Sequence, residues 1–229
     1  MSNALAQNPT FATFSGATSV QVAFGAGGTN PSLYVATVTQ EDPTASVTVA
    51  DNRNAGNYAL DRIQSVGTTG DGARASIHSI QNTSTLTATI TATLGASTTG
   101  SLKTYELTGA ATSGALDSVG GGTGVVANYS GSVTTISPNC TVVMCSSHYA
   151  DLVVVADPNY TAAFAETAGS LGYSFGEYRV DAGAAGSITL NGNNAANSSA
   201  HFAIAIAAYK TLSGGSSAAA VYAMQQNQQ

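Results

Sequence analysis

One short stretch of the sequence brings together the three residue types of a hydrolytic triad. His148 follows Ser146 and Ser147, and Asp151 comes shortly after it. A histidine can take the proton of a serine hydroxyl, and a carboxylate can orient the imidazole ring. Such triads also need an oxyanion hole, and the sequence has no Gly-x-Ser-x-Gly turn that would expose a nucleophilic serine. We therefore expect no catalytic role for His148, and we assign no catalytic residue in this chain.

The remaining histidines and the glutamates give no stronger signal for acid–base chemistry. His78 and His201 lie in alternating stretches, where we expect half-buried or surface strand residues. A glycosidase site with paired carboxylates would require Glu106, Glu166 and Glu177 to meet in space, and no spacing in the sequence supports that.

Metal and nucleotide sites are also unsupported by the sequence. The segment Asp51–Gly56 resembles the start of a calcium loop, but its third position is Arg53, which cannot bind a cation. The glycine-rich stretches do not follow the strand, Gly-x-Gly-x-x-Gly and helix order of a dinucleotide site. We predict no metal and no cofactor.

The two cysteines are predicted to be free. Cys140 and Cys145 are separated by an odd number of positions, which places them on opposite faces of a strand. In an extended chain they lie roughly 16 Å apart, whereas a disulfide needs Cα atoms within about 7 Å. A Cys-x4-Cys pair without a further ligand nearby is half a zinc site. Two small buried thiols are the expected outcome.

These residues must be positioned by strands, because period-two alternation dominates the sequence. In Thr85–Leu94 the apolar residues occupy every second position and five threonines occupy the others. A strand collects such residues on one face, and a helix would spread them around its circumference. The stretch predicts a strand with one buried face and one wet, uncharged face.

Similar runs follow at short intervals and are separated by clusters of glycine, asparagine and aspartate, which favour turns. The predicted strands lie at 18–24, 32–38, 46–49, 75–80, 102–107, 132–136, 141–145, 151–156, 172–180, 187–190 and 201–209. Many short strands without a helical period indicate an all-β fold, an antiparallel β-sandwich of jelly-roll-like type. We see no repeat with a period of 20–50 residues.

The charge balance excludes some functions. The chain has 229 residues, and only 8% of them are charged, with a formal net charge of -6. Six lysines and arginines cannot line a nucleic-acid groove. No apolar run approaches the roughly 18 residues of a membrane helix, and Met1 is not followed by a secretory signal pattern, which favours a leaderless protein.

The two ends differ in composition from the middle. We expect an N-terminal arm at residues 1–16, a sandwich domain at residues 17–212, and a Gly/Ser joint with a short tail at residues 213–229. Two tethered ends suit a protein that packs against copies of itself or against a neighbour.

The order of elements from Ser46 to Lys210 resembles a jelly-roll-like module of phage virion (decoration or fibre) proteins and bacterial surface proteins. The resemblance rests on five stretches: Ser46–Tyr58, the Thr85–Leu94 strand, Tyr105–Asp117, Gly131–Thr135 and the strand that ends at Lys210. It implies a display or adhesion module without enzymatic activity.

Composition and resemblance together favour a virion structural protein, a capsid decoration (cement) or fibre component. Its expected partners are further copies of itself and a capsid or other virion protein, with the virion as its location. The alternative is a carbohydrate-binding or adhesin-type module at a cell or particle surface. In that case Tyr58, Tyr149, Tyr160 and Tyr173 are candidates for stacking on a glycan.

Overall fold

A computed structural model describes the fold of the chain. The residues it describes are 4–7, 11–125, 128–149, 158–168, 172–193 and 201–212. Every element among them is a β-strand, and the strands form two seven-stranded sheets in which all strand pairs are antiparallel.

The first sheet is built from the N-terminal half of the chain. Its strands are β1 (Ala4–Gln7), β2 (Ala12–Ala23), β3 (Ser32–Gln40), β4 (Val47–Asp51), β5 (Ala59–Thr68), β6 (Asp71–Asn82) and β7 (Thr89–Thr108). The sheet has the order β1-β7-β3-β6-β5. The long strand β7 pairs with β2 along one side, and with β4 and then β3 along the other.

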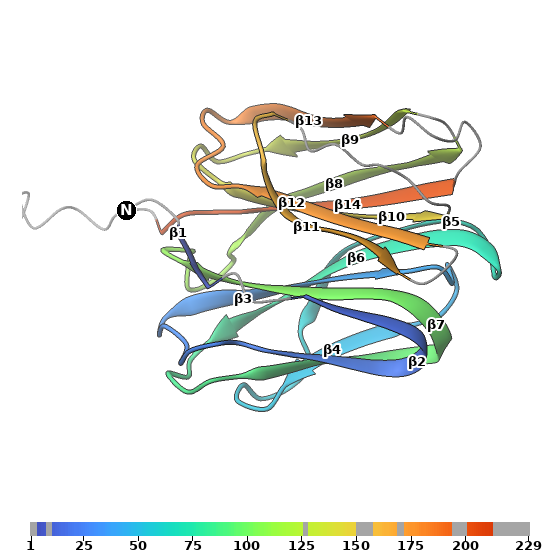
Figure 1. Cartoon of the computed structure of the whole chain (residues 1–229). Coiled ribbons are helices and arrows are strands. Elements are labelled where there is room, and N and C mark those ends of the chain that lie inside the picture. The colour runs from blue at the N-terminus through green and yellow to red at the C-terminus, as the bar shows by residue number, and fades with distance from the viewer. Residues whose placement is uncertain are drawn as a thin grey trace, which may run out of the picture.

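The second sheet is built from the C-terminal half. Its strands are β8 (Leu116–Val125), β9 (Asn128–Thr135), β10 (Thr141–Tyr149), β11 (Thr161–Ala168), β12 (Gly172–Arg179), β13 (Gly186–Asn193) and β14 (His201–Tyr209). Their order is β11-β12-β10-β14-β8-β9-β13. In Figure 1 the strands stack in tiers, with β2 and β4 at the bottom of the view and β9 and β13 at the top.

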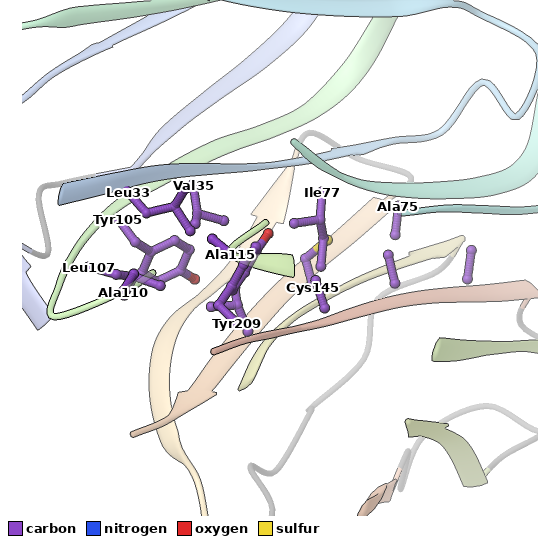
Figure 2. Close-up of a cluster of buried hydrophobic side chains, with 14 of the residues drawn as sticks. Leu33, Val35, Ala75, Ile77, Tyr105, Leu107, Ala110, Ala115, Cys145 and Tyr209 are labelled. Carbon is purple, nitrogen blue, oxygen red and sulfur yellow. The ribbon is translucent and has the colours of Figure 1, made fainter. Parts of the chain in front are cut away.

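The two sheets pack face to face through a core of small and aromatic side chains. Val35 and Ile77 of the first sheet meet Val143, Cys145 and Tyr209 of the second, as Figure 2 shows for most of this cluster. These side chains are buried completely. A hydrogen bond crosses the interface as well, because the Tyr209 hydroxyl group donates to Asp61 Oδ2 over 2.6 Å.

Each sheet also has a core of its own on the side away from the other sheet. In the first sheet the N-terminal part of β7 folds over β3, and Ile90 packs with Tyr34 and Val38. In the second sheet Leu190 of β13 packs over Met144 and Ile204. The central strands β3, β10 and β14 are therefore covered on both faces, and almost all of their residues are buried.

The structure confirms the prediction of an all-β fold with an antiparallel sandwich; the jelly-roll connectivity stays a prediction. The alternation of Thr85–Leu94 is confirmed for Ile90, Ala92 and Leu94, which are buried. Leu86 differs, because it precedes the first residue of β7 and is 58% exposed.

The segment expected to be an N-terminal arm is part of the first sheet wherever it is described. Residues 4–7 form β1 and residues 12–16 begin β2, and both pair with β7. Leu5 packs against the core between the sheets, and this contact ties β1 to the domain. The predicted joint and tail at 213–229 lie outside the described residues.

Candidate functional site

The serine–histidine pair that opened the search is a buried structural contact. His148 on β10 is 1% exposed, and its Nε2 lies 3.0 Å from the Oγ of Ser146. Burial lowers the pKa of His148 to about 3, so the ring is neutral at ordinary pH. Ser147 points to the other face, where it donates to the carbonyl oxygen of Gln40. Asp151 lies outside the described residues.

The same arrangement occurs a second time, on β6. His78 Nε2 lies 3.1 Å from Ser76 Oγ, and the ring is 2% exposed. Burial, together with the charge of Arg74, lowers the pKa of His78 to about 4. We had expected a half-buried or surface residue, and this was wrong. His78 pairs with Ala36 on the face away from the second sheet, where the outer core of the first sheet lies. Neither serine–histidine pair is reached by solvent, so neither can meet a substrate.

The third histidine lies at the edge of the interface between the sheets. His201 Nδ1 is 3.0 Å from Asp71 Oδ1, with the histidine side chain 21% exposed and the aspartate 59%. The pair joins the first residue of β14 to the first residue of β6. A contact between side chains that are this exposed contributes little to stability.

The glutamates considered for a glycosidase site do not converge. Glu106 follows Tyr105, which faces the interface between the sheets, and so Glu106 points to the far face of the first sheet. Glu177 precedes Tyr178, which packs against the same interface, and so Glu177 points to the far face of the second sheet. Two sheets therefore separate the two carboxyl groups. The side chain of Glu166 lies outside the described residues.

Glu106 has a structural role instead. It is fully buried, and it accepts hydrogen bonds from Gln7 Nε2 at 2.6 Å and Ser32 Oγ at 2.8 Å. The amide of Thr29 donates to Oε1, the same oxygen that accepts from Ser32, while Gln7 donates to Oε2. These contacts join β1, β3 and the loop before β3.

Aspartates at the turns also satisfy backbone amides. Asp51 accepts from the amides of Arg53 and Asn54 at 2.6 Å and from the Tyr58 hydroxyl at 2.9 Å. Burial opposes the charge of Asp117, but hydrogen bonds from Ser137 and Ile136 outweigh it and lower the pKa of this carboxyl group. The calcium-like stretch is thus an ordinary capped turn. Among the described residues no three His, Cys, Asp or Glu side chains gather as a metal site.

Both thiols are free and buried, as predicted, and they lie in different cores. Cys145 faces the interface between the sheets and donates to the Ser76 carbonyl, while Cys140 belongs to the outer core of the second sheet. Burial raises the pKa of both thiols, in the case of Cys140 to about 12. The two side chains therefore carry no reactive thiolate.

We expect a thiol reagent to leave the folded protein unlabelled. Because reaction requires opening of the core, labelling of both thiols should be more than about 1000-fold slower than in denaturant. Mass spectrometry after timed exposure to a maleimide measures this, and the Cys140→Ser variant reports Cys145 alone. Rapid stoichiometric labelling of native protein would contradict the buried placement.

A surface cavity of about 450 Å³ lies at the end of the molecule where the chain passes from one sheet to the other. It is lined by Ala111, Ser113, Ser137, Pro138, Asn139, Lys210 and Thr211. The lining offers hydroxyl and amide groups and one ammonium group. These groups could hold a small polar ligand, and the lining contains no acid–base pair.

The proposed glycan-stacking tyrosines are only partly available. Tyr58 is 5% exposed and belongs to the outer core of the first sheet, with its hydroxyl bound to Asp51. Tyr160 packs against the outer core of the second sheet. Tyr149 is half-buried at the end of β10, and the side chain of Tyr173 lies outside the described residues. The described tyrosines form no aromatic platform.

Comparisons with known proteins identify no relative: no family model, no curated protein and no solved structure matches this chain. In the described part of the chain there is no helix with the length and apolar character to cross a membrane.

Proposed function

We propose that this protein is a structural component of a virion, a capsid decoration or fibre protein that works by association with copies of itself and with other virion proteins. The proposal assigns it no catalytic step. Its narrower part, the virion, rests on the resemblance of residues 46–210 to virion modules.

One observation carries the proposal: two of the histidines, Glu106 and both thiols are buried in contacts that hold the fold. His78 and His148 are buried and neutral, Glu106 is bound by three donors, and both thiols are enclosed in apolar cores. A protein whose titratable side chains make internal contacts is suited to a rigid structural role.

The outer surface supports association. Its charged residues are few, and large apolar side chains are exposed at several places: Leu60 is 52% exposed, Leu86 58% and Ile136 76%. Soluble monomers protect their surface and sheet edges with charge. Burial of uncharged surface against a neighbour would remove the need for that protection.

Glycan binding by an adhesin-type module is the weaker proposal. The residues expected to stack on a glycan are tyrosines, and one of them, Tyr58, belongs to the outer core of the first sheet. Binding of the purified protein to a glycan array would favour this function over assembly.

Sedimentation of the purified full chain tests association. We expect oligomers that grow with protein concentration, and an association constant that changes less than about threefold between low and high salt, because few charges are present to be screened. The same preparation should bind particles of its source that lack this protein. A chain that stays monomeric at high concentration and leaves such particles undecorated contradicts the proposal.

A further inference from the structure

The two halves of the chain have the same connectivity. The first sheet contains the order β5-β6-β3-β7 and the second contains β11-β12-β10-β14, so that each strand of one series has a counterpart in the other. Strand β7 is matched by β13 followed by β14, and β2 is matched by β8 and β9, because β2 pairs with β7 as β8 pairs with β14 and β9 with β13.

The halves also share an irregularity in the pairing of their edge strands. The register of β5 against β6 shifts between Leu60 and Arg62, and that of β11 against β12 shifts between Ala162 and Phe164. In each case one residue is skipped on the outer strand. A β-bulge is a specific local feature, and its recurrence at one place in two sheets is hard to obtain by chance.

A second shared bulge lies at the start of each half. The register of β1 shifts between Leu5 and Gln7 where it pairs with β7, and the pairing of β8 with β14 shifts beside Tyr209. Leu5 faces Leu107, and Leu116 faces Tyr209, at corresponding positions. Strand β1, which lies in the predicted arm, is therefore the counterpart of the first part of β8.

When the two halves are aligned by their bulges, corresponding residues face the same side of their sheets. Val35 of β3 corresponds to Val143 of β10, and both face the interface between the sheets. Their neighbours Ala36 and Met144 also correspond, and each faces the outer core of its own half.

The contacts between the halves follow a twofold relation. Strands β5 and β6 contact β8, β14 and β10, and their counterparts β11 and β12 contact β2, β7 and β3 in the corresponding pairs. Strands β3 and β10, which are counterparts, contact each other.

The chain segments that directly follow each half, residues 109–111 and 210–212, pair with each other. The amide of Ala111 donates to the Lys210 carbonyl at 3.0 Å, and that of Leu212 donates to the Gly109 carbonyl at 2.6 Å. Ala110 and Thr211 form an antiparallel bridge between these two bonds. Each segment thus pairs with its own counterpart, as two identical chains do across a twofold axis.

Short sequence matches agree with this correspondence. Residues 47–51 read Val-Thr-Val-Ala-Asp and residues 153–157 read Val-Val-Val-Ala-Asp, each shortly after a central strand. The start of β7 reads Thr-Ile-Thr, and its counterpart in β13, at 187–189, reads Ser-Ile-Thr.

We infer that the chain is a covalently joined pair of one β unit, residues 4–108 and 115–209, and that the face between the sheets is a docking surface whose partner is a second copy of the same unit. This inference does not depend on the proposed function. Either unit presents that face to the other, as the subunits of a twofold dimer do.

The docking faces of the two units differ in their side chains along β14 and its counterpart β7. Ala203 and Ala205 of β14 face β6, whereas their counterparts Ser101 and Lys103 on β7 face the side of β12. Here Thr39 Oγ1 lies 2.6 Å from Ser174 Oγ. A test must therefore keep both units and change only the order in which they are joined.

Exchanging the order of the units provides that test. The variant chain begins at Gly114 and runs to Leu212, continues through a copy of residues 111–115, and then runs from Leu5 to Ser113. If the units are equivalent, this new joint spans the same path as the natural linker. We expect a folded chain whose Tm lies within about 5 °C of that of a chain covering residues 4–212 in natural order.

A matched control uses the same joint but opens the chain at Gly56, an exposed turn inside the first unit with open space around it. That cut divides a unit, so we expect the control to melt at least about 10 °C below the order-exchanged chain. The inference is overturned if the order-exchanged chain fails to fold, or if it melts at or below the control.

Discussion

Acidification from pH 7 to about pH 4.5 is expected to remove roughly 5 kcal/mol of folding free energy through two buried histidines. His78 and His148 have folded-state pKa values of about 4 and about 3, against about 6.5 in the unfolded chain. The unfolded state therefore binds more protons below pH 6.5. Stability is fully present above that pH, and each histidine removes about 1.4 kcal/mol per pH unit as the pH falls toward its folded pKa.

Chemical denaturation at a series of pH values measures this loss. The variant His78→Gln/His148→Gln removes both titrating rings, and its stability should fall by less than about 1 kcal/mol over the same range. Asp61 and Glu41 act in the opposite direction, because burial raises the pKa of both carboxyl groups, but they contribute equally to both proteins. Equal pH slopes for the two proteins would show that the histidines are not buried.

Of all glycine-to-alanine substitutions in the first sheet, Gly100→Ala should lower the stability of the protein most. A Cβ atom at Gly100 would lie 1.9 Å from the backbone oxygen of Thr39 on β3. Backbone cannot move aside as a flexible side chain can, so β3 and β7 must separate locally. We expect a loss of about 3 kcal/mol or more in the free energy of unfolding, measured by urea denaturation.

Gly25→Ala is the matched control, because no atom lies within 4 Å of a Cβ at Gly25 and its backbone does not require glycine. This variant should change stability by less than about 0.5 kcal/mol. A mild effect of Gly100→Ala, comparable to that of the control, would contradict the close pairing of β3 and β7.

Strand positions were predictable where one face is buried and the other is wet. Ile90, Ala92 and Leu94 alternate with threonines in the sequence and are buried in the structure. The cysteines were placed correctly for the same reason, since Cys140 and Cys145 lie in cores on opposite faces of the second sheet.

Burial on both faces could not be predicted from that pattern. His78, His148 and Glu106 are buried because the sheets stack and their ends curl over the central strands, and no local spacing signals this. Their roles depend on partners far along the chain, such as Gln7 for Glu106. The roles of these three side chains therefore follow from the three-dimensional structure and not from the sequence.

The duplication was missed because its period is about as long as half the chain and its sequence signal is short. Val47–Asp51 and residues 153–157 match closely, but most paired positions have diverged, as with Lys103 and Ala205. The shared bulges beside Leu60 and Ala162 preserve the relation in the backbone, where side-chain identity is not needed.

Electron cryo-microscopy of native particles from the source of this protein tests its proposed role most directly. We predict density for the two stacked sheets at regular positions on the particle, in contact with neighbouring copies or with the shell, and with a fixed copy number. Particles that lack this density, together with a purified chain that turns over a substrate as a monomer, would contradict the conclusion that the protein works by association.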